Sequence, residues 1–131
     1  MKNLFYASLI LFIASCTKES DAPLIGSLTI QSTTIERTAD ANLTFSYEIS
    51  DDNGLNRLKI DVIDDFPDAR VALAPFYYTE TLTISGSSKS ETLNLPIPYP
   101  DVEVGNYELK LSVQDIDGNE TSAKRNFEIV E

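Results

Sequence analysis

Two acidic turn segments hold the side chains of this sequence that are best suited to bind a metal ion. Calcium takes six to eight oxygen ligands from carboxylates, amides and carbonyls, and clustered carboxylates repel one another without a cation. The candidate ligands are Asp51, Asp52, Asn53, Asp115, Asp117, Asn119 and Glu120. The alternative is plain turn chemistry, because Asn-Gly and Asp-Gly satisfy hairpin backbones by themselves. Both interpretations stay open at this point.

Catalytic machinery is harder to assemble from this composition. The chain has no histidine, one cysteine and five glycines, which removes Ser-His-Asp and Cys-His arrangements, the usual zinc ligand and a glycine-rich phosphate loop. A carboxylate pair could hydrolyse glycosides only if a cleft held the two groups at a fixed separation. We therefore expect a protein that is not an enzyme and has no cofactor except, in the calcium interpretation, that ion.

A third group of residues is suited to contact a ligand. Phe76, Tyr77 and Tyr78 are consecutive, so strand alternation must turn at least one ring outward. An outward ring could stack on a sugar or anchor a protein partner, or it could instead cover a sheet edge. With Asp65 and Phe66, these residues form the predicted contact region. The acidic set around it, Asp61, Asp64, Asp65 and Asp68, is interpreted as a solvated loop with Asp61 facing out of its strand.

The elements that position these residues are strands, because apolar residues repeat with a period of two from Leu24 onward. Alternation is clearest in residues 43–49, 58–62, 93–97, 107–113 and 127–129, with further strands near 28–35 and 76–84. Turn signals such as Asp52-Asn53-Gly54 and Asp117-Gly118-Asn119 separate them. Seven short strands predict a single antiparallel immunoglobulin-like sandwich, all-β apart from a helical signal peptide before it.

This topology makes three predictions about position. Tyr107 takes the place of the tyrosine corner, in which the hydroxyl bonds back to nearby backbone. The two acidic turns meet at one end of the sandwich. The first strand starts at that end, so the loop from Asp64 to Pro75 lies at the opposite end, where loops of this fold can bind soluble partners.

The N-terminus resembles a bacterial lipoprotein signal. Lys2 precedes an apolar run from Leu4 to Ile13 that is too short to span a bilayer as a helix. Ile13-Ala14-Ser15-Cys16 resembles the lipobox, which implies cleavage before Cys16 and lipid attachment to it. The alternative is an ordinary signal peptide with an incidental cysteine. We expect residues 1–15 to be the signal, 16–23 a lipidated cysteine and flexible tether, and 24–131 the sandwich.

Charge restricts the partners further. Loss of Lys2 with the signal leaves nine basic residues against 21 acidic ones, a net charge of −12. Nucleic acid and anionic lipid surfaces both need basic side chains for neutralisation, so neither is expected as a partner. Contact with the membrane is expected only through the lipid. Acidic residues Glu19 and Asp21 after the cysteine resemble the signal that sends Bacteroidota lipoproteins to the cell surface.

Two blocks carry a wider resemblance, LTFSYEISDDNGLNRLKIDVIDDF and LNLPIPYPDVEVGNYELKLSVQDIDGNETSAKRNFEIVE. They are similar to small Bacteroidota lipoproteins of a domain-of-unknown-function family with an immunoglobulin-like fold. In that family the segment after the third strand often carries histidines beside a Phe-Asp pair. Here residues 64–70 read DDFPDAR, so a metal role for such histidines does not carry over.

The resemblance and the patterns together give a functional expectation. The protein is expected to be anchored to the outer membrane, on the cell surface or on the periplasmic face, as a non-catalytic binding or adhesion module. An envelope protein or a glycan is the expected partner. The alternative is a calcium-stabilised structural spacer or accessory subunit of an envelope complex.

Overall fold

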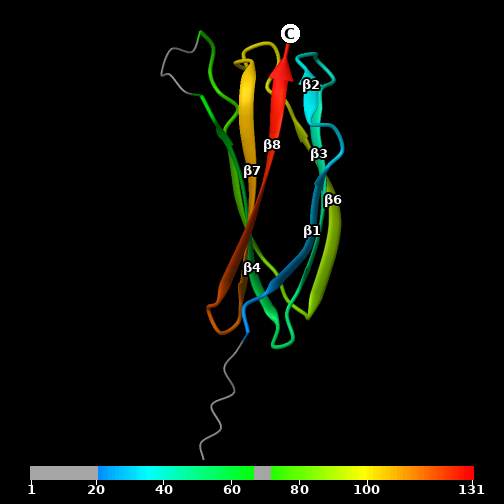
Figure 1. Ribbon diagram of the computed structural model, residues 1–131, viewed down its shortest axis with the longest axis vertical. Coiled ribbons are helices and arrows are strands. Elements are labelled where there is room, and N and C mark those ends of the chain that lie inside the picture. Colours follow the sequence, from blue (N-terminus) through cyan, green and yellow to red (C-terminus); the bar gives the residue numbers. More distant parts are fainter. Residues whose placement is uncertain (1–20, 67–71) are drawn as a thin grey trace, which may run out of the picture.

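The computed structural model describes residues 21–66 and 72–131, and these form two β-sheets packed face to face (Figure 1). The smaller sheet has the order β1-β3-β6 and the larger has the order β2-β8-β7-β4-β5. The strands are β1 (Leu24–Ile30), β2 (Thr34–Glu36), β3 (Asn42–Ser50), β4 (Leu55–Asp64), β5 (Tyr78–Thr83), β6 (Ser88–Pro96), β7 (Gly105–Asp115) and β8 (Glu120–Val130). The predicted immunoglobulin-like sandwich is confirmed, while the expected signal helix and Cys16 lie outside the described residues.

The first predicted strand differs from the expectation, because the segment near 28–35 is divided between the two sheets. β1 pairs antiparallel with β3, whereas β2 pairs parallel with β8. The described part of the chain therefore has eight strands and one parallel pair rather than seven antiparallel strands. By crossing over, the chain places β1 along the edge of β3 and β2 along the edge of β8. These two strand edges are therefore not free to pair with another molecule.

The core lies between the sheets and consists of the inward residues of each alternating strand. In β7, Tyr107, Leu109, Leu111 and Val113 are fully buried, as their period of two predicts. The largest contributors from the other strands are Leu43, Phe45, Tyr47, Leu55, Leu58, Ile60 and Ile129. Because a sandwich without a disulfide has only packing to stabilise it, this layer determines the stability of the domain.

The two ends of the sandwich are distinct. At the end where β1 starts, here called the proximal end, the N–H of Leu55 donates to the Gly86 carbonyl at 2.8 Å and that of Ile116 to the Gly54 carbonyl at 3.0 Å. The β3–β4, β5–β6 and β7–β8 turns are thus in contact, so the two acidic turns share one end as predicted. The C-terminus and residues 72–77, which lead into β5, lie at the other, distal end (Figure 1).

The described residues contain no helix that is long and apolar enough to cross a membrane.

Candidate functional site

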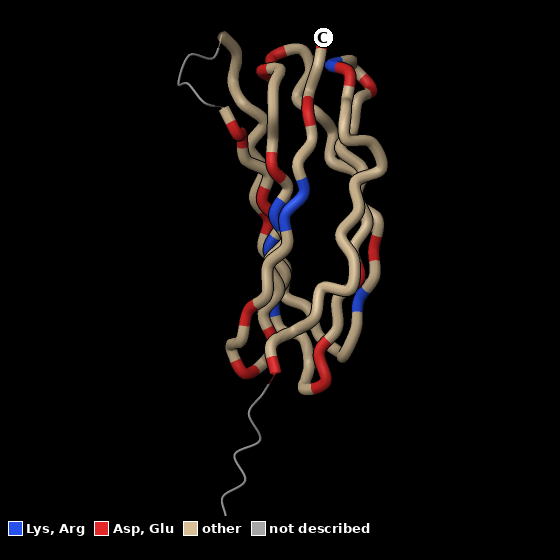
Figure 2. Tube along the Cα trace, in the orientation of Figure 1, with Lys and Arg blue, Asp and Glu red and all other residues tan. Residues whose placement is uncertain are grey.

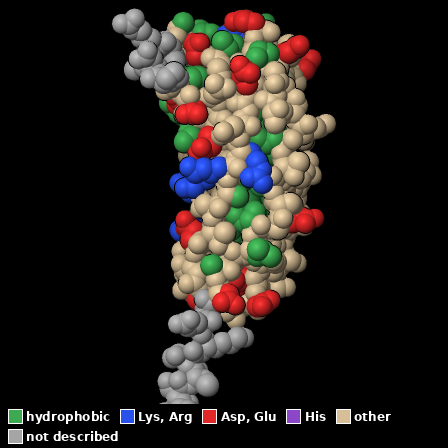
Figure 3. All heavy atoms as spheres, viewed as in Figure 1, with side chains coloured by type: hydrophobic (Ala, Val, Ile, Leu, Met, Phe, Trp, Pro, Cys, Tyr) green, Lys and Arg blue, Asp and Glu red, His purple; other side chains and the backbone are tan. Residues whose placement is uncertain are grey.

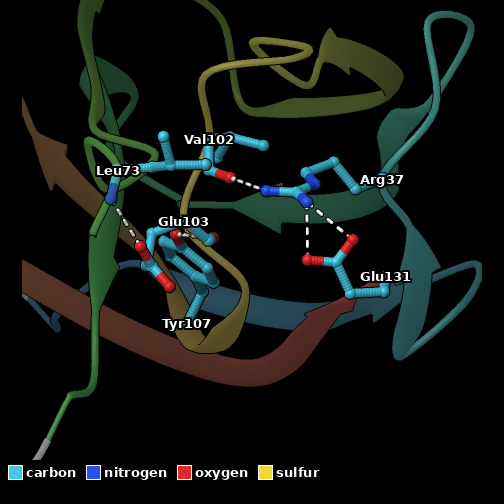
Figure 4. Close-up of polar contacts among 6 residues, drawn as sticks. All are labelled: Arg37, Leu73, Val102, Glu103, Tyr107 and Glu131. Carbon is cyan, nitrogen blue, oxygen red and sulfur yellow. Dashed lines mark hydrogen bonds and ion pairs between the residues drawn. The ribbon is translucent and has the colours of Figure 1, made fainter. Parts of the chain in front are cut away.

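The distal end is organised by the hydroxyl of Tyr107. It donates to the backbone carbonyl of Glu103 at 2.6 Å (Figure 4) and accepts the N–H of Phe76 at 3.2 Å. This confirms the predicted tyrosine corner, and it adds a bond to the segment between β4 and β5. Burial raises the pKa of the Tyr107 hydroxyl, and the hydrogen bond from Phe76 opposes that rise. The hydroxyl therefore acts as a neutral link between two loops.

A second set of bonds fixes the same segment against the β6–β7 loop. The N–H of Leu73 donates to the Glu103 carboxylate at 2.7 Å, and the N–H of Glu103 donates to the Ala74 carbonyl at 2.8 Å. Ala74 also forms a parallel bridge with Val102. The N–H groups of Leu73 and Phe76 bond to side chains, and the Ala74 carbonyl bonds to the backbone of Glu103. The segment is therefore fixed just before Tyr77.

An arginine connects the C-terminus to the rest of the distal end. Arg37, which follows β2, donates to the Val102 carbonyl at 3.1 Å and binds both carboxylate oxygens of Glu131 at 2.5 and 2.6 Å (Figure 4). Nη2 of the guanidinium makes both bonds to the Glu131 carboxylate, while Nη1 makes the bond to Val102, so one side chain links the C-terminus to the β6–β7 loop. The distal end is therefore a frame in which β2, β8 and the β6–β7 loop hold one another.

Only part of the predicted contact region reaches the surface of this frame. Phe76 is 3% exposed and belongs to the core, which corrects its placement among the contact residues. Phe66 is partly buried with its ring edge against Tyr107, at 5.3 Å between ring centres. Asp65 is exposed, and its N–H donates to the Asn106 carbonyl at 2.8 Å.

Tyr77 is the exposed aromatic residue of the three, with 63% of its surface accessible. Interaction with the Asp64 carboxylate raises the pKa of its hydroxyl. Tyr78 turns to the sheet, and its hydroxyl donates to Glu80, a contact that raises the pKa of Tyr78 to about 12. The three consecutive rings thus do not share one face, as expected. Phe76 is buried and Tyr77 is exposed, while Tyr78 is partly buried and lines a groove together with Tyr77.

Ile63 lies beside Tyr77 and was not among the predicted contact residues. It is 45% exposed, and with Tyr77, Asp61 and Thr79 it lines a shallow groove of about 240 Å³. The sequence contained a signal for it. Leu58, Ile60 and Val62 point inward, so an isoleucine directly after Val62 has to point outward. We call this pair of Tyr77 and Ile63 the distal apolar patch.

The predicted calcium ligands of the first acidic turn are used by the turn itself. One oxygen of the Asp51 carboxylate accepts the N–H groups of Asn53 at 2.8 Å and Gly54 at 2.9 Å. Asp51 is buried, whereas Asp52 and Asn53 are exposed. The carboxylate thus caps the hairpin, as the turn interpretation predicts for this segment.

The second acidic turn is built in the same way around Asp115, which is fully buried. One carboxylate oxygen accepts the N–H groups of Asp117 at 2.9 Å and Asn119 at 2.8 Å, and the other accepts the Asn119 amide at 2.9 Å. Burial alone would raise the pKa of this carboxyl. The bonds from Asn119, Asp117 and Gly118 outweigh burial and lower the pKa below its usual value.

The remaining acidic candidates are dispersed. Glu120 opens β8 and pairs with Gln114 on the sheet rather than with the turn. Among residues 21–66 and 72–131, no three carboxylates are grouped so that they could hold a metal ion. This arrangement favours turn chemistry, and calcium binding stays a prediction.

The second acidic set also separates in space. Asp61 faces out of β4, where it accepts a hydrogen bond from Thr79 at 2.7 Å and pairs with Lys59 at 3.3 Å. Asp64 ends that strand and Asp65 follows it, while Asp68 lies outside the described residues.

The family described as "Domain of unknown function (DUF4625)" matches residues 14–130. No curated protein matches the chain.

Proposed function

For a chain that belongs to the DUF4625 domain family, we propose a non-catalytic binding role in a bacterial envelope. In this proposal Cys16 is lipidated after signal cleavage, and the lipid holds the protein on the outer membrane, as in the Bacteroidota lipoproteins that the sequence resembles. The tether of residues 16–23 separates the lipid from β1. The sandwich then presents its distal end to the surroundings.

The observation that carries this proposal is the exposure of Tyr77 and Ile63 at the end opposite the tether. Large apolar side chains that lie together on a rigid surface mark binding sites more often than isolated ones do. Tyr77 is therefore suited to stack on a sugar or to anchor a protein.

The binding part of the proposal is tested by capture of partners from the organism's own envelope with the lipidated full-length protein. Tyr77→Ser should reduce capture about tenfold, the loss expected when a central aromatic contact is removed. Tyr99→Ser is the matched control, because Tyr99 is 51% exposed but lies outside the groove. Equal capture by Tyr77→Ser and the unmodified protein would contradict the proposed site.

The anchoring part has a separate test. Mass spectrometry of the native protein should find Cys16 at the N-terminus with acyl groups attached, and protease treatment of intact cells should cleave a surface-exposed domain. Cys16→Ala should release the protein from the membrane fraction, because the anchor supplies the membrane affinity. Retention of the first fifteen residues in the native product would refute the lipoprotein assignment.

A further inference from the structure

The outer face of the larger sheet carries a group of basic side chains, although the protein as a whole is strongly acidic. Arg57 and Lys59 lie on β4, Lys110 lies on β7 and Lys124 lies on β8. Their neighbours along the strands, such as Leu58 and Leu109, are fully buried, so alternation turns the basic residues outward. Figures 2 and 3 show Lys and Arg gathered towards mid-height of the sandwich, with acidic residues at both ends. We call these four residues the basic face.

The basic face is only partly neutralised. Lys59 pairs with Asp61 at 3.3 Å, and Lys124 pairs with Glu108 at 3.2 Å. Within residues 21–66 and 72–131, neither Arg57 nor Lys110 has a carboxylate within 4.0 Å. The groove between the ion pairs is lined by three cations and by the carboxylates of Asp61 and Glu120, which leaves one positive charge in excess.

One contact on this face is unfavourable by itself. Lys110 and Lys124 are directly opposite each other in the β7–β8 ladder, and like charges at such positions destabilise a sheet. The ion pair of Lys124 with Glu108, and Asp61 opposite Lys110 in the β4–β7 ladder, offset part of this repulsion. An anion bound between them would remove the repulsion.

The basic face is continuous with the distal apolar patch. Arg57, Lys59 and Lys110 line a groove of about 390 Å³ together with the acidic residues Asp61 and Glu120. Asp61 is also part of the groove that contains Tyr77. From Arg57 to Ile63 the strand runs six residues, a span of roughly 20 Å at about 3.3 Å per residue. An extended ligand could thus contact the charged groups and the aromatic ring together.

The composition of this surface indicates the kind of ligand. Protein interfaces have cores depleted in lysine and enriched in apolar groups, whereas this strip carries three cations, two carboxylates (Asp61 and Glu120) and several hydroxyls, with an aromatic ring at its end. Thr79 and Thr81 add hydroxyls from the edge strand β5. Cations bind carboxylate or sulfate groups, hydroxyls bond to sugar hydroxyls, and an aromatic ring covers the apolar face of a sugar.

We infer that the outer face of β4, β5 and β7 binds an anionic polysaccharide, a chain of sugar rings that carry carboxylate or sulfate groups. Tyr77 stacks on one ring, and Arg57, Lys59 and Lys110 contact the anionic groups of the rings that follow. The net negative charge of the protein does not prevent this binding, because charges are screened beyond about 8 Å at physiological salt. This inference rests on the proposed binding function and names its ligand class.

The test measures affinity of the purified protein at about 0.15 M salt for two anionic polysaccharides, polygalacturonate and dextran sulfate. Neutral dextran and polyglutamate serve as comparison polymers. At least one anionic polysaccharide should bind, and neutral dextran should not. Tighter binding of polygalacturonate would indicate recognition of carboxylate groups, and tighter binding of dextran sulfate would indicate recognition of sulfate groups. Absence of binding to both anionic polysaccharides, or equally tight binding of polyglutamate, would overturn the inference, the second by indicating an acidic polypeptide.

Substitutions locate the site. Lys59→Gln and Lys110→Gln should each weaken binding about fivefold, the size expected for one exposed ion pair, and Tyr77→Ser should weaken it by a similar factor. Lys89→Gln makes the same charge change on β6 of the other sheet and should leave affinity within about twofold. Melting curves check that each variant is folded. If one of the lysine variants is not folded, Arg57→Gln is measured in its place. An equal loss in Lys89→Gln would show unspecific attraction and refute the site.

The inference and the proposed function fail in different ways. If Tyr77→Ser abolishes capture of envelope partners while no anionic polysaccharide binds, the binding function stands and the ligand class is wrong. If neither capture nor polysaccharide binding depends on Tyr77, both are wrong.

Discussion

Replacing Tyr107 with phenylalanine removes one oxygen atom that joins two loops at the distal end. The ring would keep its packing, with Phe127 stacked at 5.5 Å and Phe66 edge-on at 5.3 Å between ring centres. Only the bonds to the Glu103 carbonyl and from the Phe76 N–H are lost. The variant therefore isolates the contribution of the tyrosine corner from that of the aromatic core.

The magnitude follows from these two bonds. A typical hydrogen bond contributes about 1 kcal/mol net, and leaving a buried donor such as the Phe76 N–H unsatisfied costs about 1–3 kcal/mol. We expect the free energy of unfolding to fall by about 2–3 kcal/mol. For a domain of this size that corresponds to a melting temperature lower by roughly 10 °C.

Tyr47→Phe is the matched control, because Tyr47 is 1% exposed and loses the same atom. Its hydroxyl donates at 2.8 Å to Glu91, whose side chain is 40% exposed. Water can reach that carboxylate when the hydroxyl is gone, so the loss should stay below about 1 kcal/mol.

Urea unfolding at neutral pH gives the unfolding free energy of both variants. Circular dichroism follows the transition, because each variant lacks one tyrosine and tyrosine fluorescence would differ between them. A loss below about 0.5 kcal/mol in Tyr107→Phe, well under the expected range, would refute the reasoning. A Tyr47→Phe loss as large as that of Tyr107→Phe would do the same.

Three further predictions concern turns. Gly105 has a φ of +141°, and a Cβ there would overlap Cε1 of the Phe66 ring and lie 3.1 Å from its Cδ1. Gly105→Ala should therefore lower the free energy of unfolding, measured in urea, by about 2–4 kcal/mol. Gly118→Ala, at φ +90° with nothing within 4 Å, should lose only about 1 kcal/mol, and equal losses would contradict the overlap. Because the pKa of Asp115 is lowered by folding, its carboxylate stabilises the fold above the unfolded-state pKa of 3.8, and this stabilisation is lost as pH falls through the folded-state pKa. The difference in unfolding free energy between wild type and Asp115→Asn should therefore narrow below pH 3.8. A difference that stays constant with pH would argue against this linkage. Calcium followed by chelator should leave the melting temperature unchanged, because turn bonds already use the Asp115 oxygens, whereas a rise with calcium that chelator reverses would establish the ion site.

Alternation along single strands was enough to predict most of the core. Tyr107, Leu109, Leu111 and Val113 are buried as their spacing requires, because a strand turns successive side chains to opposite faces whatever its neighbours are. The same local rule predicted that the rings of residues 76–78 would not all point the same way. It could not assign Phe76 to the core, since that depends on the Tyr107 hydroxyl, which lies 31 residues further along the chain.

The sequence by itself determined the fold class, the turn segments and the inward face of each strand, because these depend on residues within a few positions of one another. Only the tertiary structure decided the division of the first strand between two sheets, the contact of Ile63 with the groove of Tyr77, and the assembly of Arg57, Lys59 and Lys110 into one face. Those features depend on strand order and register, in which Asp61 is opposite Lys110. Local periodicity tells which side of a strand a residue occupies, but the partner across the ladder is fixed only when the sheets pack.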